Sequence, residues 1–262
     1  MSVSIHHLAD WRARGEKFVM VTAYDALMAR ILDEAGIPVL LVGDSVSNVL
    51  LGHPTTLQVT MDDMLHHARA VARGAKDALL VGDMPFGSYQ TPPDAVRNAT
   101  EFLRVGMHCV KLEGAGPAVD AVAALTDRGI PVMGHLGLTP QFVNAIGGYK
   151  VQGRGDAGDR LLEDAKALQD AGIFTLVLEC VPSTLGERVT RELEIPTIGI
   201  GAGPDTSGQV LVCWDMLGLT PGPSPRFVKR YADVASDIRD AVQLFAKEVS
   251  EGIYPAPEHE YR

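Results

Sequence analysis

The amino-acid sequence predicts one α/β domain, a (β/α)8 TIM barrel in which eight parallel strands alternate with helices. Short apolar runs recur along the chain, bounded by glycine or polar residues, as in strands buried on both faces of a parallel sheet. Segments with helix formers and helix start signals separate them. The length of 262 residues also suits one such barrel. An open doubly wound sheet is the alternative, but it would carry a dinucleotide fingerprint or a Walker motif, and neither is present.

The expected strands follow from the Val-, Ile- and Leu-rich runs. They span 18–21, 39–45, 79–83, 109–114, 130–135, 175–180, 197–203 and 210–214. The interval between the fifth strand and the next helix, 136–158, is long and rich in glycine, as functional or disordered loops are.

The expected helices follow from start and stop signals. They span 26–35, 61–73, 92–105, 116–128, 160–171 and 231–251. Thr60 and Asp63 form a capping box, and Pro92 and Pro93 suit a first helical turn. No linker composition interrupts the interior, so we expect a single domain over 1–262, with a short N-terminal extension and a polar C-terminal tail.

Composition excludes several classes of function. A formal net charge of −10 argues against a nucleic-acid partner, because nucleic-acid binding needs a basic face. An anionic substrate would need local positive charge from a metal or a few Lys or Arg residues. Cys109, Cys180 and Cys213 lack disulfide or zinc spacing, which favours small core residues in a reducing compartment. No apolar run is long enough for a membrane, so we expect a soluble, cytoplasmic protein.

Two strand ends share the residues Leu-Val-Gly-Asp and so deliver two carboxylates, Asp44 and Asp83. A carboxylate at the end of a buried strand is costly to desolvate unless it is paired or binds a metal. One isolated Gly-Asp is usually a helix N-cap or a turn. The repetition favours two acids brought to one place.

Glu113 and Glu179 also end expected strands, on the face of the barrel where chemistry is found. Four acids on one rim would repel each other unless a cation binds them, and oxygen ligands suit Mg²⁺ or a similar hard ion. Because Mg²⁺ takes few protein carboxylates, at least one acid would remain free for proton transfer.

Lys111 lies two residues before Glu113 and so shares its face of the strand. It could grip an anionic substrate, stabilise an oxyanion, form a Schiff base, or only balance the charge of Glu113 in an internal ion pair. His135 also ends a strand and could bind substrate or be a structural histidine. His66 and His67 are expected to be solvated or packed on a helix. The glycines of 199–204 suit either phosphate binding or a tight turn.

The segments around these residues resemble one family, the ketopantoate hydroxymethyltransferases. They are TAYD (22–25), VGDS (42–45), GDMPFGSY (82–89), VKLEG (110–114), GHLGLTPQ (134–141), GGYKVQG (147–153) and GIGAG (199–203). Each is weakly specific alone, but their order and spacing together are highly specific and cover almost the whole chain.

The resemblance implies a barrel of the phosphoenolpyruvate/pyruvate-domain type that binds Mg²⁺ through Asp44 and Asp83, with Glu113 in or next to the metal shell. The substrates would be 3-methyl-2-oxobutanoate and 5,10-methylenetetrahydrofolate, and the products 2-dehydropantoate, an intermediate of pantothenate biosynthesis, and tetrahydrofolate.

The resemblance also implies that the 2-oxo acid chelates the metal and is held by Ser45 and Lys111. His135 would be a further substrate contact. Glu179 is the base that removes the C3 proton to give a Mg²⁺-stabilised enolate. The resemblance also implies a homo-oligomer, a decamer of two stacked pentamers.

The alternative is a Mg²⁺-dependent 2-oxo acid lyase or mutase of the isocitrate lyase and phosphoenolpyruvate mutase type. Its lyases carry a Lys-Lys-Cys-Gly-His loop, which this sequence lacks. A non-catalytic barrel that serves as a binding protein also stays open, because acids at strand ends alone do not exclude it.

Overall fold

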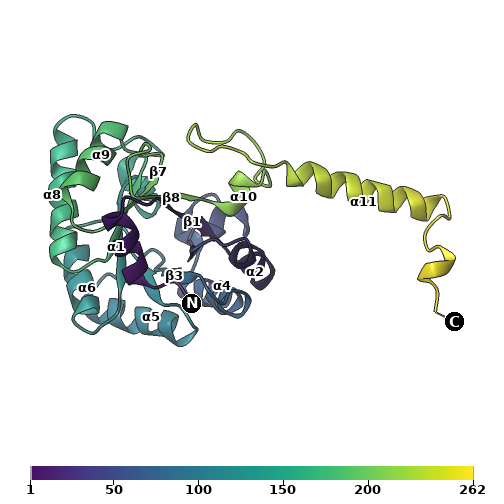
Figure 1. Cartoon of the computed structure of the whole chain (residues 1–262), viewed down its shortest axis with the longest axis horizontal. Helices are drawn as coiled ribbons and strands as arrows, with labels where there is room; N and C mark the ends of the chain where they lie inside the picture. The colour runs from purple at the N-terminus through teal and green to yellow at the C-terminus, as the bar shows by residue number, and fades with distance from the viewer. Residues whose placement is uncertain (1, 262) are drawn as a thin grey trace. The chain divides into compact units, whose positions relative to one another are not determined.

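A computed structural model describes residues 2–261, which form two compact units, one ending at Val212 and the other beginning at Cys213. The first unit is a closed barrel of eight parallel strands in sequence order (Figure 1), which confirms the predicted fold class. The strands are β1 (Phe18–Thr22), β2 (Val39–Val42), β3 (Leu79–Asp83), β4 (Cys109–Lys111), β5 (Val132–Gly137), β6 (Thr175–Glu179), β7 (Thr197–Ile200) and β8 (Gly208–Leu211).

Helices follow most strands and cover the barrel. They are α1 (Ile5–Ala13), α2 (Ala26–Glu34), α3 (Val46–Val49), α4 (Met61–Gly74), α5 (Pro92–Arg104), α6 (Pro117–Thr126), α7 (Val143–Ile146), α8 (Asp156–Asp170) and α9 (Ser183–Glu192), with short 3-10 turns η1 (Thr56–Gln58) and η2 (Pro140–Phe142). The predicted capping box is confirmed, because Thr60 Oγ1 accepts a hydrogen bond from the Asp63 amide and the Asp63 carboxylate accepts one from the Thr60 amide.

The barrel interior is apolar at the end opposite the strand C-termini. Its side chains come from every strand and include Met20, Leu41, Val81, Cys109, Met133, Val177, Ile198 and Val210. Leu8 of α1 is fully buried against this cluster, and Trp11 packs on it as well. The N-terminal segment, expected only as a short extension, therefore supplies a helix to the core, and its burial stabilises the barrel.

Several strand boundaries differ from the predictions, and β2, β6 and β7 end earlier than expected, at Val42, Glu179 and Ile200. The eighth strand is Gly208–Leu211, and Cys213 and Trp214 start a short helix, α10 (Cys213–Met216). Pairing begins at Gly208 because a Cβ there would lie 2.7 Å from the Phe18 ring, so only glycine permits this approach. The fourth strand ends at Lys111, which leaves Glu113 on the loop that follows.

The interval 136–158 is also more ordered than expected. Strand β5 extends to Gly137, η2 and α7 occupy part of the interval, and α8 begins at Asp156 rather than at 160. We refer to residues 138–155 as the β5–α8 loop. It matters for the site because it starts beside the end of β5 and finishes beside α9.

The second unit contains α10, the long helix α11 (Val234–Ser250) and the 3-10 turn η3 (Pro257–His259). Helix α11 is amphipathic, as predicted, but none of its residues is buried. Ile238, Val242, Phe245 and Val249 lie on one stripe of the helix and are 49–60% exposed. None of the helices in the described residues combines the length and the apolar character that a membrane crossing needs.

Candidate active site

The acids and bases predicted from the strand ends lie together at the C-terminal face of the barrel. Asp83 ends β3 and is paired in register with Lys111, the last residue of β4. Lys111 Nζ lies 2.8 Å from Asp83 Oδ1 and 3.7 Å from Glu113 Oε1. All three side chains are at least 96% buried. The buried cation and the two buried anions need one another, because removal of either the lysine or an acid would leave an uncompensated buried charge.

Asp44 lies two residues after the end of β2, beside Asp83 at the end of the neighbouring β3. The Asp44 amide donates a hydrogen bond of 3.0 Å to Asp83 Oδ2. Burial, with the negative charges of Asp83 and Glu113, raises the pKa of Asp44 well above its usual range. Burial also raises the pKa of Asp83, although the Lys111 ammonium opposes that shift. These raised pKa values mean that ionisation of both acids is unfavourable in this site unless a cation lies beside them.

His135 lies inside the barrel mouth between two glutamates. Its Nδ1 is 3.3 Å from Glu113 Oε1 and 3.2 Å from Lys111 Nζ, and its Nε2 is 3.2 Å from Glu179 Oε2. Burial and the Lys111 charge lower the pKa of His135, but Glu113 and Glu179 outweigh them and raise it to about 9. Burial raises the pKa of Glu113, yet His135 and Lys111 together lower it below its usual range. The imidazolium thus links the acid cluster to Glu179.

Glu179 ends β6 and is the most accessible acid of the group, with 16% of its side chain exposed. Two backbone features set its position. Gly137 lies so close that a Cβ there would meet the Glu179 carbonyl at 2.2 Å. Cys180, directly after Glu179, has φ +48°, a left-handed conformation that is rare outside glycine. Local strain of this kind is common beside reacting groups, so it marks Glu179 as a candidate base.

Ser45, the residue after Asp44, contacts Tyr24, to which the sequence analysis assigned no role. Ser45 Oγ and the Tyr24 hydroxyl are 2.9 Å apart, and His67 Nδ1 contacts the Tyr24 carbonyl at 2.7 Å. His67 therefore has a packing role, as predicted. Tyr24 belongs to the TAYD segment, so the segment was noticed but its tyrosine was given no role.

Gln141, in the β5–α8 loop, was also missed and connects most of the site. It is 2% exposed. Its backbone amide donates to Glu113 Oε2 at 3.0 Å, and its side-chain Nε2 donates to Asp44 Oδ2 at 2.9 Å and to the Met84 carbonyl at 3.0 Å. The Tyr89 hydroxyl donates to Gln141 Oε1 at 2.6 Å. Gln141 thus holds two carboxylates, Glu113 through its backbone amide and Asp44 through its side-chain amide.

The donor set fits a hard divalent cation held by few protein oxygens. Within residues 2–261 no three or more His, Cys, Asp and Glu side chains are arranged as a complete metal-binding group. Mg²⁺ does not require one, since it commonly uses one or two carboxylates with water and substrate oxygens. Asp44 and Asp83 provide adjacent carboxylates whose ionised forms a bound cation would stabilise. Asp83 Oδ1 and Glu113 Oε1 are also buried without a hydrogen bond, although Lys111 lies near both.

The remaining features noted in the sequence have structural explanations. A Cβ at Gly203 would lie 2.6 Å from Ser183 Cβ, so the turn after β7 needs glycine to pack against α9. All three cysteines are free, with Cys109 and Cys213 buried and Cys180 partly buried.

Solved structures with similar folds were found at low sequence identity. The chain aligns with a structure of 2,3-dimethylmalate lyase, titled as a member of the PEP mutase/isocitrate lyase superfamily, with a TM-score of 0.65 and 16% identity over 100% of this chain and 89% of that one. It aligns with a structure of phosphonopyruvate hydrolase in complex with oxalate and Mg²⁺ with a TM-score of 0.64 and 14% identity, over 99% and 92% of the two chains. At this identity the matches show a shared TIM-barrel fold, in agreement with the closed parallel barrel of this chain.

Sequence relatives identify the family. The family profile described as "Ketopantoate hydroxymethyltransferase" matches residues 2–257. A Mycobacterium ulcerans protein named 3-methyl-2-oxobutanoate hydroxymethyltransferase is 52% identical over 98% of this chain and 87% of its own length. A Mycobacterium tuberculosis protein of the same name is 51% identical over 99% and 93%. The chain therefore belongs to the ketopantoate hydroxymethyltransferase family.

Proposed function

We propose that this enzyme transfers a hydroxymethyl group from 5,10-methylenetetrahydrofolate to 3-methyl-2-oxobutanoate and forms 2-dehydropantoate and tetrahydrofolate. The observation that carries the proposal is that the family match spans 2–257, while the strand-end residues of that match converge on one buried cluster. Relatives named 3-methyl-2-oxobutanoate hydroxymethyltransferase align with nearly the whole chain, which supports the proposal.

In this proposal Asp44 and Asp83 hold Mg²⁺, with Glu113 in or next to the metal shell. When bound, the metal withdraws electron density from the carbonyl of the 2-oxo acid and makes the C3 proton more acidic. Gln141 supports the arrangement, because its amide restrains Asp44 while its backbone restrains Glu113.

Lys111 and Ser45 hold the carboxylate end of 3-methyl-2-oxobutanoate, and His135 is a further substrate contact. The buried Lys111 ammonium stays charged, because burial lowers its pKa but Asp83 and Glu113 raise it further. A fixed cation in a water-poor site stabilises negative charge far better than one in water. The anionic substrate therefore meets local positive charge in a chain whose net charge is negative.

Glu179 is the base that takes the proton from C3. Its position beside the cluster, partly exposed, suits a group that must reach the substrate carbon. The electron pair left at C3 attacks the one-carbon unit, so a C–C bond forms. Both bonds from that carbon to N5 and N10 of the folate break over the whole reaction, and the two nitrogens take up one proton from C3 and one from water. The net reaction consumes one water, whose oxygen becomes the new hydroxyl group.

The homo-oligomer implied by the family is supported by α11. Its stripe of Ile238, Val242, Phe245 and Val249 is exposed, and contiguous apolar surface of this kind usually marks an interface. Decameric assembly and a cytoplasmic location stay predictions. Multi-angle light scattering of the full chain tests the assembly, and a monodisperse monomer would contradict it.

The experiment that tests the function is turnover of 3-methyl-2-oxobutanoate with 5,10-methylenetetrahydrofolate, with and without a chelator. We expect 2-dehydropantoate and tetrahydrofolate with Mg²⁺, loss of product with the chelator, and recovery after Mg²⁺ is restored. The alternative, a 2-oxo acid C–C lyase or mutase, shares only the fold with this chain. Cleavage of 2-oxo acids without any need for folate would favour it.

A further inference from the structure

The β5–α8 loop forms a bridge over the acid cluster because it is fixed at two points on either side. At its start Gln141 binds Asp44 and Glu113. Near its end the Gln152 amide donates a hydrogen bond of 2.9 Å to the Cys180 carbonyl, directly after Glu179. Residues 142–151 therefore pass beside the proposed base and the proposed substrate contacts.

This bridge presents aromatic rings to solvent. Phe142 and Tyr149 are 41% and 57% exposed. The Phe142 ring lies against Gly114, where a Cβ would be 3.5 Å from the ring. Partial burial, with the negative charges of Asp44 and Glu179, raises the pKa of the Tyr149 phenol, so the phenol is within the field of the acid cluster. Flat aromatic faces at the edge of a site are suited to stack on a flat aromatic ligand.

The same loop also carries two cations that have no partner. Within the described residues the side chains of Lys150 and Arg154 make no ion pair and no hydrogen bond. Arg188, in contrast, is paired with Asp159 at 2.6 Å and with Glu192 at 3.3 Å. In a chain of net charge −10, two unpaired cations beside the site favour an anionic ligand.

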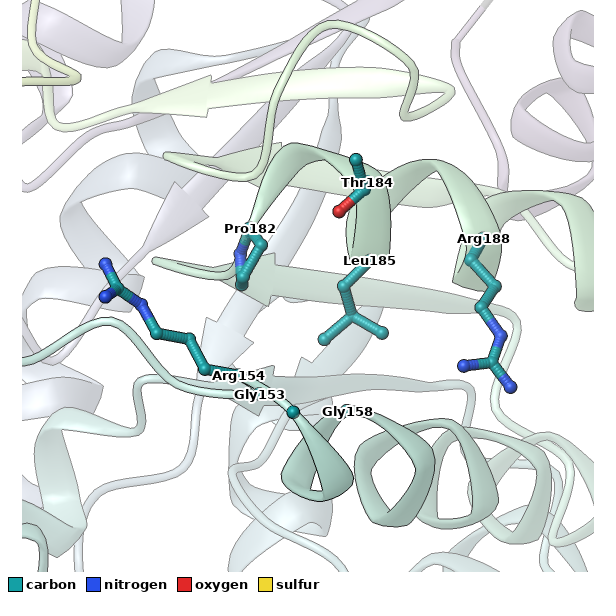
Figure 2. Close-up of a pocket in the computed structure, with 8 residues that line it drawn as sticks. Gly153, Arg154, Gly158, Pro182, Thr184, Leu185 and Arg188 are labelled. Atoms are coloured by element: carbon teal, nitrogen blue, oxygen red, sulfur yellow. The ribbon is translucent and has the colours of Figure 1, made fainter.

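Arg154 lines a cavity of about 370 Å³ between the loop and α9. Figure 2 shows Arg154 and Arg188 at opposite ends of this cavity, with Pro182 and Leu185 between them. Pro182 is three residues from Glu179, so their Cα atoms lie within about 11 Å of each other. Tyr149 and Arg154 are five residues apart, and their Cα atoms lie within about 18 Å of each other because a chain cannot extend further.

We propose that the β5–α8 loop is the folate-binding element, in which Phe142 and Tyr149 contact the ring system of 5,10-methylenetetrahydrofolate and Arg154 binds the carboxylates of its glutamate tail. This inference rests on the proposed function, which requires a folate next to Glu179. The ligand is elongated, with flat rings at one end and two carboxylates at the other, and the loop offers aromatic faces and then a free guanidinium in that order. A guanidinium recognises carboxylates through paired donors.

The test compares Arg154→Gln with the unmodified full-length chain on two donors, 5,10-methylenetetrahydrofolate and 5,10-methylenetetrahydropteroate, which lacks the glutamate. We expect Arg154→Gln to raise KM for the folate about tenfold or more, because a charge-assisted hydrogen bond is lost, and to leave KM for the pteroate unchanged. Exchange of the C3 proton of 3-methyl-2-oxobutanoate without folate should also be unchanged, which shows an intact site. Arg160→Gln, on α8 but outside the cavity, is the matched control.

A second pair of variants tests the aromatic contact. Tyr149→Leu should raise KM for both donors, whereas Tyr149→Phe, which keeps the ring, should behave as the unmodified chain.

The assignment of Arg154 would be overturned if Arg154→Gln had the same KM for the folate as the unmodified chain. It would also be overturned if KM rose equally for both donors, or if the variant lost C3 exchange. Equal KM in Tyr149→Leu and the unmodified chain, or the same rise in Tyr149→Phe, would overturn the ring contact. If the unmodified chain showed neither turnover nor C3 exchange, the proposed function would fail as well, and that result is distinct from failure of the variants alone.

Discussion

Replacement of Gln141 by leucine removes the side chain that connects the β5–α8 loop to the barrel. The amide donates to Asp44 Oδ2 and to the Met84 carbonyl and accepts from the Tyr89 hydroxyl. Leucine has a similar size, so the variant keeps the packing but makes none of these bonds. Asp44 and Met84 are then left with buried acceptors that have lost a donor.

The expected cost follows from these contacts. A hydrogen bond to a charged group is worth about 1.5–3 kcal/mol and a neutral one about 1 kcal/mol. The Tyr89 hydroxyl keeps a second acceptor, the Glu113 carbonyl, at 3.3 Å and so contributes little to the loss. Gln141→Leu should therefore lower the free energy of unfolding of the barrel by about 3 kcal/mol.

Urea unfolding without added Mg²⁺, followed by circular dichroism at one protein concentration, measures this change. Gln90→Leu is the control, because Gln90 is exposed in the loop after β3 and its replacement should cost less than about 0.5 kcal/mol. A loss below about 1 kcal/mol for Gln141→Leu, similar to that control, would show that the amide does not hold the site together.

Three further predictions concern the chemistry. Glu179→Gln should slow C3 proton exchange by about 10²–10⁴-fold, measured by NMR in deuterated water, while calorimetry still detects binding of 3-methyl-2-oxobutanoate; full exchange would mean that another group is the base. Asp83→Ala should abolish measurable Mg²⁺ binding in calorimetry, and an unchanged affinity would remove Asp83 from the metal shell. Cys180→Gly should keep the exchange rate and stabilise the chain by up to about 1 kcal/mol in urea unfolding, whereas Cys180→Val should slow exchange, because only glycine adopts the left-handed backbone without strain. Equal exchange rates in the two Cys180 variants would show that this backbone does not orient Glu179.

The barrel and the cluster at its mouth were predictable because strand boundaries are encoded locally. An apolar run that ends in Asp83 or Glu179 specifies both the strand and the side chain at its C-terminal end, and closure of the barrel brings such ends together. Lys111 and His135 were found for the same reason. The structure confirms their proximity, while their roles stay proposals.

The contacts of Gln141, Tyr89 and Tyr24 could not be predicted in the same way. These residues lie outside the strands, where the path of the chain depends on tertiary packing rather than on a hydrophobic period. A buried glutamine carries no pattern of its own, and only the resemblance of the surrounding segments marked the place. Helix α9 was missed because its sequence is polar apart from a few buried positions such as Leu185 and Val189.

The central claim is that this site removes the C3 proton of 3-methyl-2-oxobutanoate with the help of Mg²⁺. The most direct measurement is NMR of the unmodified chain with that acid and Mg²⁺ in deuterated water, without folate. We expect the C3 proton signal to disappear as deuterium replaces it, and to persist when a chelator is present. A folded chain that leaves the C3 proton in place with Mg²⁺ present would contradict both the substrate and the assignment of Glu179.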